Sequence, residues 1–304
     1  MKGPLAALLV LCAAVGIVAR QQPPQRYLSA DNILKLPSKA GVRLAYGSDP
    51  LQFGELRLPE GRGPFPVAVV IHGGCYQKRF ADLHIMDALA TALTADGLAT
   101  WNIEYRKIDE PGGPWPGMFR DVAAGTDYLR ELVKKFPLDL QQVVAVGHSA
   151  GGHLALWAAA RHKVPKDSPV WSPSPVAVRG AVNIDGPSNL QWLVERDGML
   201  CGAQVMEGLV GGGPDAAKNL LATSPQPMLP LGAREAMVYR SVANPWATPE
   251  EFTRYADEVK RAGDQVMTSA VADVGHFEFL APGSTAWPQV IRAVKRAMEP
   301  APLR

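Results

Sequence analysis

The sequence has no large excess of charge of either sign, no internal repeats and only three cysteines. Its 304 residues carry 31 basic and 29 acidic side chains, and no stripe of lysine or arginine is interleaved with aromatic residues. Nucleic acid is therefore not an expected partner. No repeat or low-complexity segment divides the chain, and folds of alternating strands and helices often reach this length as one unit. We expect a single globular domain after an N-terminal leader.

The first 19 residues are typical of a secretory signal peptide. Lys2 supplies a positive charge, residues 5–18 form an apolar core, and small residues lie near position 19 before the polar run 20–24. The apolar run is short for a membrane span. We expect cleavage near Ala19, export of residues 20–304 to the periplasm or the medium, and no stable membrane insertion after processing. An uncleaved N-terminal anchor is the alternative.

Removal of that leader leaves two cysteines, Cys75 and Cys201. An oxidising compartment would allow them to pair, but one pair at unknown separation is a weak basis for predicting a disulfide. The sequence favours Cys75 as a small buried side chain.

Apolar segments of strand length alternate with segments of helical periodicity. Strands are predicted at 42–46, 54–58, 67–71, 99–105, 143–146, 178–184, 236–241 and 265–272, and helices at 82–96, 119–135, 152–162, 249–262 and 287–298. This alternation predicts an α/β fold with a mainly parallel central sheet and helices on both faces. The first two strands are predicted to form an antiparallel edge.

A Gly/Pro-rich stretch, residues 187–232, separates the sixth and seventh predicted strands. It contains helical patterns at 190–196 and 203–209. Because a bare loop of this length is uncommon in a compact domain, we expect an insertion that folds over the sheet as a cap or lid. Substrate specificity is expected to reside there.

The segment Gly147-His148-Ser149-Ala150-Gly151 is the most informative in the chain. It has the G-x-S-x-G pattern in which a serine occupies a sharp turn between a strand and a helix, and here a strand pattern precedes it and an alanine-rich helical pattern follows. The glycines allow the close backbone approach that such a turn requires. Ser149 is therefore a candidate nucleophile.

A nucleophilic serine needs a base, and the best candidate is His276, in a turn directly after the last predicted strand. The other histidines flank the serine or lie at helix ends, and no pair has the spacing of metal ligands with a third ligand nearby. Neither a metal ion nor another cofactor is expected.

The run Ile71-His72-Gly73-Gly74-Cys75 follows the third predicted strand. Backbone N–H groups in such a glycine-rich turn are suited to stabilise an oxyanion. We predict an oxyanion hole built from Gly73, Gly74 and Cys75 together with Ala150; a simple tight turn is the alternative.

With these motifs, the chain resembles the α/β-hydrolase superfamily over nearly all of its mature length. The esterase/lipase branch, with its hormone-sensitive-lipase-like and kynurenine-formamidase-like enzymes, is indicated by the segments 72–75, 102–106, 113–117 and 147–153. The resemblance implies a serine hydrolase with a Ser-His-acid triad and a small-molecule ester as substrate. It implies neither the identity of the ester nor the oligomeric state.

The acid of the triad departs from the family pattern. The resemblance places a carboxylate after the seventh strand, where this chain has Asn244, and an amide cannot stabilise an imidazolium by charge. Asp185, after the neighbouring sixth strand, is the predicted substitute, because adjacent strands lie only about 4.8 Å apart. Asp185 as a turn cap, Asn244 as a neutral orienting group and an impaired site are the alternatives.

The sequence thus predicts a carboxylic ester hydrolase with Ser149, His276 and Asp185 as its triad. Two other functions stay open: a formamide or amide hydrolase with the same residues, and a binding protein with an impaired triad. Glu104 and Arg106 are predicted to form an ion pair or a loop anchor, and the three tryptophans Trp115, Trp192 and Trp246 are candidates for lining a pocket.

Overall fold

The computed structural model describes residues 26–199, 202, 204–244 and 246–299. The predicted signal peptide and Cys201 lie outside these residues. Within this described part, no helix combines the length and the apolar character needed to cross a membrane.

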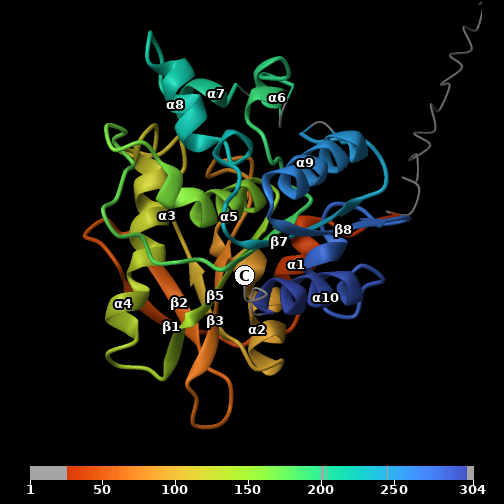
Figure 1. The fold of residues 1–304 in the computed structure, drawn as a ribbon. Coiled ribbons are helices and arrows are strands. Elements are labelled where there is room, and N and C mark those ends of the chain that lie inside the picture. Colours follow the sequence, from red (N-terminus) through yellow and green to blue (C-terminus); the bar gives the residue numbers. More distant parts are fainter. Residues whose placement is uncertain (1–25, 200–201, 203, 245, 300–304) are drawn as a thin grey trace, which may run out of the picture.

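The centre of the molecule is an eight-stranded sheet with the order β1-β2-β4-β3-β5-β6-β7-β8 (Figure 1). The strands are β1 (Val42–Ala45), β2 (Phe53–Arg57), β3 (Phe65–Ile71), β4 (Ala99–Ile103), β5 (Leu138–His148), β6 (Gly180–Ile184), β7 (Arg234–Arg240) and β8 (Gln265–Val271). β2 pairs antiparallel with β1 and β4, and all other pairs are parallel. The predicted mixed sheet with an antiparallel N-terminal edge is confirmed.

The helices are α1 (Ala30–Leu34), α2 (Asp87–Ala95), α3 (Gly117–Asp127), α4 (Leu129–Leu132), α5 (Ala150–Ala160), α6 (Gln191–Val194), α7 (Met206–Val210), α8 (Ala216–Thr223), α9 (Pro249–Ala262) and α10 (Trp287–Met298). Short 3₁₀ helices occur at Leu83–Met86, Arg161–Lys163, Gln226–Met228 and Glu278–Leu280.

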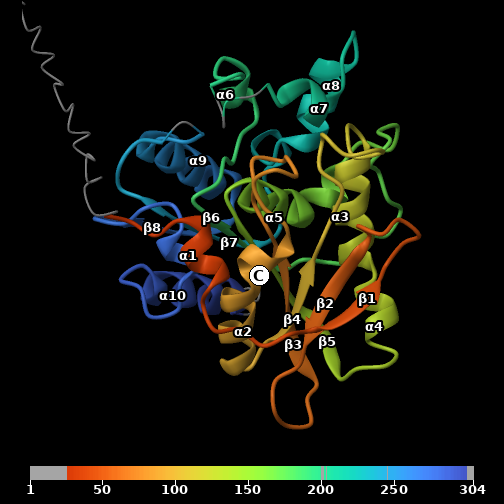
Figure 2. The same cartoon turned by 180° about the vertical axis from the view of Figure 1, so that it is seen from behind.

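Helices cover both faces of the sheet, as the alternation of strands and helices predicts (Figures 1 and 2). Alternate residues of β3 point to opposite sides. Val67 and Val69 join the apolar core shared with α3, α5 and α9, whereas Ala68 and Val70 join the core shared with α1, α2 and α10. Parallel strands that are buried on both faces explain the nearly continuous apolar runs in the sequence.

Helix ends follow local chemistry. α9 spans the predicted range because Thr248 and Glu251 form a capping box before it and Gly263 ends it with a φ of 95°. The helix predicted at 119–135 is instead two segments, α3 and α4, and it stops early at Leu132. Pro137 follows closely, and because helical backbone is disfavoured for the residue before a proline, the helix cannot continue through Phe136.

The segment between β6 and β7 holds α6, α7 and α8, which lie together beyond α3 and α5 at one end of the molecule (Figure 1). Helical structure was predicted for α6 and α7, whereas α1 and α8 were not predicted. Because parallel strands end at the same edge, the segments that follow β3, β5, β6, β7 and β8 meet there. All predicted site residues lie in these segments.

Candidate active site

Ser149 occupies the sharp turn between β5 and α5. Its φ of 56° and ψ of −123° lie in a region that residues other than glycine rarely adopt. Its N–H donates to the carbonyl of Ile184, at 2.8 Å. Such backbone strain costs about 1–3 kcal/mol and is typically retained at functional positions.

The glycines of the pentapeptide are required by close packing. A Cβ at Gly147 would lie 1.9 Å from the carbonyl oxygen of Gly151, and one at Gly151 would lie 2.1 Å from that of Ile71. Both contacts are far shorter than a real side chain permits. The turn can therefore form only with glycine on both sides of Ser149.

Asp185 and His276 are in direct contact, although they are 91 residues apart. The Nδ1 atom of His276 lies 2.7 Å from Oδ2 of Asp185. Asp185 directly follows β6, is fully buried, and adopts a φ of 49°. The structure thus brings together the histidine and the carboxylate that the sequence predicted as partners.

Asp185 also accepts hydrogen bonds from β7 and the loop after it. Arg240 donates its Nε to Oδ2 at 2.7 Å and its backbone N–H to Oδ1 at 3.2 Å, and the Nδ2 of Asn244 donates to Oδ1 at 3.4 Å. In addition, the indole N–H of Trp246 donates to the backbone carbonyl of Asp185. Sequence reasoning did not identify Arg240 as part of the site.

Asn244, in the position where the family pattern places the acid, caps its own turn. Its Oδ1 accepts the backbone N–H groups of Trp246 and Ala247, at 3.1 and 2.6 Å. With its oxygen engaged there, its amide nitrogen is the atom that faces Asp185. Asn244 therefore supports the carboxylate of Asp185 and does not contact His276 through any hydrogen bond among the described residues.

His148 links the serine turn to His276. The Nε2–H of its buried ring donates to the backbone carbonyl of His276 at 2.8 Å, and the two rings lie 4.2 Å apart. Burial lowers the pKa of His148 well below its usual value, and the charges of His276 and Arg240 add to this. A neutral His148 thus holds the backbone of His276 against the turn that carries Ser149.

The predicted oxyanion turn lies against Ser149. A Cβ at Gly73 would be 2.8 Å from Cβ of Ser149, and Gly74 and Cys75 have φ values of 107° and 52°. Cys75 and Ala150 both line the pocket that Ser149 faces. Of the four residues predicted for the oxyanion hole, Gly73 thus packs on Ser149, and Cys75 and Ala150 share its pocket.

Cys75 is disulfide-bonded, which corrects the expectation of a small buried side chain without a bond. It is half-buried. The sequence alone offered no separation between cysteines from which to infer a bond. Cys201 lies outside the described residues.

A buried charge cluster, not expected from the sequence, supports the turn after β3 that holds residues 72–75. Oε1 of Glu104 lies 2.9 Å from Nε2 of His72 and 2.6 Å from Nζ of Lys107, and Oε2 accepts the N–H of Leu83. Burial raises the pKa of Glu104, but His72 and Lys107 outweigh it and lower the pKa to about 2. Of the two alternatives predicted for Glu104 and Arg106, the ion pair does not form, because Arg106 pairs with Asp121, but Glu104 anchors the segment at Leu83.

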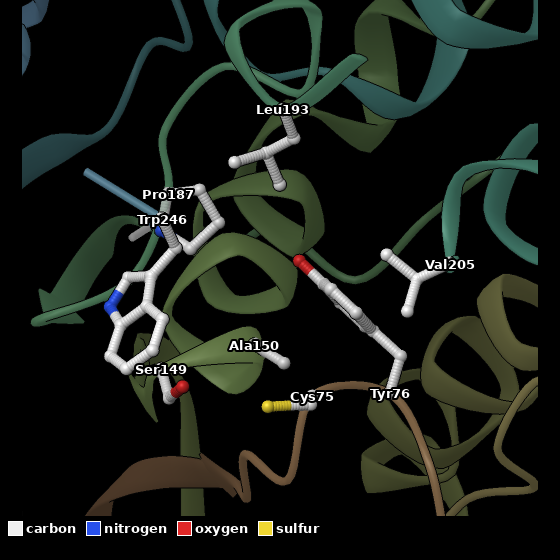
Figure 3. Close-up of a pocket in the computed structure, with 8 residues that line it drawn as sticks. All are labelled: Cys75, Tyr76, Ser149, Ala150, Pro187, Leu193, Val205 and Trp246. Atoms are coloured by element: carbon white, nitrogen blue, oxygen red, sulfur yellow. The ribbon is translucent and has the colours of Figure 1, made fainter. Parts of the chain in front are cut away.

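A small apolar pocket of about 310 Å³, including its open mouth, lies beside Ser149 (Figure 3). Its lining comes from three parts of the chain: the turns after β3 and β5, the insertion between β6 and β7, and the loop after β7. The lining residues are Cys75, Tyr76, Ser149, Ala150, Pro187, Leu193, Val205 and Trp246. The insertion predicted to act as a cap thus contributes three side chains to the pocket.

Tyr76 is fixed within this pocket by a buried hydrogen-bond chain. Its hydroxyl lies 3.2 Å from Nδ1 of His153, whose Nε2 lies 2.8 Å from the carbonyl oxygen of Thr223 in α8. Burial lowers the pKa of His153 to about 4. The neutral ring donates to Thr223 and accepts the Tyr76 hydroxyl, so the pocket wall is tied to the insertion between β6 and β7.

Of the three tryptophans considered as pocket residues, only Trp246 lines this pocket. Trp115 packs edge to face on Phe119, and Trp192 lies beneath Arg254. Trp246 also packs against the ring of His276, with centroids 4.6 Å apart.

One group of potential metal ligands occurs among the described residues: Glu55, His84 and Asp87. The guanidinium of Arg57 already neutralises this group, because its Nη2 is 2.8 Å from the Glu55 carboxylate and 2.7 Å from that of Asp87. The group is distant in sequence from the serine site and shares none of its residues.

Known proteins resemble this chain in sequence and fold. The model of the BD-FAE family matches residues 55–229. Esterase LipC of Mycobacterium tuberculosis is 31% identical over 118 residues, which are 38% of this chain and 28% of LipC. The matched part therefore spans less than a third of that curated relative.

Two solved structures show the same architecture. A truncated carbohydrate esterase from gut microbiota has 18% identity and a TM-score of 0.69 over 86% of this chain and 97% of its own. Esterase 2 of Thermogutta terrifontis has 17% identity and a TM-score of 0.65 over 86% and 93%. The fold is that of the α/β-hydrolases, and the chain belongs to the BD-FAE family, whose model covers more than half of it.

Proposed function

We propose that this protein is a serine hydrolase that cleaves a carboxylic ester through an acyl-enzyme intermediate. The observation that carries the proposal is the 2.7 Å contact between His276 and Asp185, at the same sheet edge as the strained Ser149. Family membership and the match with an esterase add support.

In the proposed reaction, His276 takes the proton of the Ser149 hydroxyl as its oxygen attacks the ester carbonyl. Asp185 orients the imidazole and balances its charge, and the alcohol leaves with the proton from His276. A water molecule activated by His276 then hydrolyses the acyl-enzyme. Backbone N–H groups of Gly74 or Cys75, and of Ala150 at the start of α5, would stabilise the oxyanion. No step requires a cofactor.

We propose a short apolar acyl group as the part of the substrate that enters the pocket. Apart from Ser149 and the Tyr76 hydroxyl, the side chains of the lining are apolar or sulfur-bearing. The pocket is small, since its 310 Å³ include the open mouth. The solved neighbour that is a carbohydrate esterase makes acylated sugars a sensible first set of substrates.

We also propose export, on the basis of the N-terminal sequence. The disulfide at Cys75 fits an oxidising compartment, since such bonds are rare in the cytosol. Expression of the full chain followed by fractionation and mass spectrometry of the mature N-terminus tests this. A start near residue 20 in the periplasm or medium supports it, and an intact residue 1 in the cytosol refutes it.

The catalytic proposal is tested by steady-state hydrolysis of p-nitrophenyl acetate and butyrate by residues 20–304. Ser149→Ala should abolish turnover, and Asp185→Asn should lower kcat by about 10⁴, the effect of such a change in a serine protease triad. Turnover that Ser149→Ala leaves intact would refute the proposal. Comparison with an N-formyl aryl amine separates an esterase from a formamide hydrolase, and turnover of neither would favour a binding protein.

A further inference from the structure

Two aromatic side chains bound the pocket beside Ser149 on opposite sides. Figure 3 shows Tyr76 and Trp246 facing each other across it, and both belong to its lining. Trp246 packs on the ring of His276, with centroids 4.6 Å apart. Tyr76 is buried and comes directly after Cys75 in the turn that follows β3. The pocket therefore has a side next to the histidine and a side formed by Tyr76.

The proposed reaction gives these two sides different roles. His276 delivers a proton to the leaving alcohol, so the alcohol must lie on the side where Trp246 packs on His276. The acyl group is bonded to the same carbonyl carbon as the alcohol oxygen and points away from it. An acyl chain carried by Ser149 therefore extends toward the side that Tyr76 forms.

The side chain of Tyr76 is held at both of its ends. Its backbone carbonyl accepts the N–H of Ile108 at 3.0 Å, and its hydroxyl lies 3.2 Å from Nδ1 of His153. The rings of Tyr76 and His153 meet edge to face, with centroids 5.9 Å apart, and His153 packs in the same way on Phe119 at 6.0 Å. A ring held by hydrogen bonds and close packing resists displacement by a longer acyl chain.

The hydroxyl of Tyr76 has no proton to offer a substrate. Nε2 of His153 lies 2.8 Å from the carbonyl oxygen of Thr223, which can only accept, so Nε2 carries a proton. Nδ1 of the neutral ring then has a lone pair and accepts the proton of the Tyr76 hydroxyl. The hydroxyl thus anchors the ring of Tyr76 and is not a donor for the oxyanion.

Building on the proposed function, we propose that the ring of Tyr76 determines specificity by restricting the acyl group to short chains. The space behind the ring is occupied by the rings of His153 and Phe119. Truncation of Tyr76 would open room bordered by these two rings, and further methylene groups of an acyl chain could fill it. One methylene more or less in an apolar pocket changes kcat/KM by roughly 10- to 200-fold.

Steady-state hydrolysis of p-nitrophenyl hexanoate and acetate by the mature protein tests this role. The ratio of kcat/KM for hexanoate to that for acetate should rise at least about tenfold in Tyr76→Ala. Tyr76→Leu, which leaves a smaller gap in the core, should raise the ratio by less. Tyr76→Phe keeps the ring and should leave the ratio unchanged. Tyr128→Ala, which removes a ring stacked on Trp101 outside the pocket, is the matched control.

An unchanged ratio in Tyr76→Ala, or in Tyr76→Leu should the alanine variant not fold, overturns the proposal. A rise in Tyr76→Phe as large as that in Tyr76→Ala also overturns it, because the hydroxyl and not the ring would then set the limit.

Binding of the product acids separates this proposal from the proposed function, because it needs no turnover. NMR titrations with hexanoate and acetate compare Ser149→Ala with Ser149→Ala/Tyr76→Ala, or with the leucine variant in its place. The Kd of hexanoate should fall about tenfold in the alanine variant, as expected for about two more buried methylene groups, and that of acetate should not change. Such a fall supports the proposal even where no ester is hydrolysed. An unchanged hexanoate Kd overturns it even where Ser149 is the nucleophile.

Discussion

Asp185 receives hydrogen bonds from a histidine, an arginine and an asparagine, and these partners differ in charge. Asn244 contributes a neutral donor and engages its own oxygen in a turn. A second carboxylate at that position would therefore face the first.

Asn244→Asp should lower kcat/KM for p-nitrophenyl acetate by about tenfold. The change retains the turn-capping oxygen but replaces the donor by a like charge about 3.4 Å from Asp185, and like charges at such distances disturb the ionisation of both groups. Asn244→Ser, which adds no charge, should cost less. A kcat above that of the natural protein would show that a carboxylate at 244 is the better acid.

A second residue-scale prediction concerns Glu235, which is fully buried in β7. Burial raises its pKa to about 8, and a hydrogen bond from Tyr255 at 2.8 Å opposes this only in part. Between about pH 4.5 and 8 the unfolded chain has lost a proton that the folded protein keeps. The titration of Glu235 therefore lowers the free energy of unfolding by about 1.4 kcal/mol for each unit by which the pH rises in that range.

Urea unfolding at pH 6 and pH 8 measures that slope. Glu235→Gln should reduce the loss of unfolding free energy between the two pH values, whereas Glu131→Gln, at an exposed helix position, should not change it. If Glu235→Gln and the natural protein show the same pH dependence, Glu235 is not the cause of the slope.

Residue by residue, the sequence allowed the candidate triad to be predicted because each member directly follows a predicted strand. Parallel topology then brings strand ends to one edge. Arg240 was not predictable in the same way. Its importance depends on the register between β6 and β7, which aligns Ile184 with Val238 and so carries Arg240 to the carboxylate of Asp185.

At the level of elements, the turn after β3 depends on the strand beside it. Glu104, at the end of β4, joins His72 of that turn to Lys107, and all three are buried. Paired buried charges are tolerated, but a single charge left without its partner is costly.

Glu104→Gln should therefore lower the free energy of unfolding by up to about 3–5 kcal/mol, because it leaves buried Lys107 with only the more distant carboxylate of Glu110, at 3.8 Å. Glu104→Gln/Lys107→Met, which removes both charges, should recover most of the loss. Urea denaturation of the two variants gives the comparison. A double variant no more stable than the single one would mean that Lys107 is not the cause.

The insertion between β6 and β7 is a second element with a testable role. Leu193 of α6 is buried and lines the pocket, while its neighbour Val194 is exposed. Leu193→Ala should raise the ratio of kcat/KM for p-nitrophenyl octanoate to that for acetate by about tenfold, since one methylene more or less in an apolar pocket is worth about 1–3 kcal/mol. Val194→Ala is the matched control. An unchanged ratio in Leu193→Ala would show that α6 does not determine which acyl chain length is preferred.

Over the whole molecule, the order of strands and helices was predictable because apolar periodicity and helix caps are local signals. α9 and α10 match their predicted ranges. α1 and α8 were missed, since short helices give little periodic signal and depend on tertiary packing. The disulfide at Cys75 depends on distances that a sequence does not contain.

The central claim, that Ser149 is activated by His276 and Asp185, is tested most directly by reaction with paraoxon, which phosphorylates Thermogutta terrifontis esterase 2. The adduct would be located by peptide mass spectrometry, and its rate of formation compared between the natural protein and Asp185→Asn. We predict a single adduct on Ser149, formed at least about 10²-fold more slowly in Asp185→Asn, in keeping with the loss of triad orientation. A Ser149 without an adduct, or labelled equally fast in both proteins, would contradict the account.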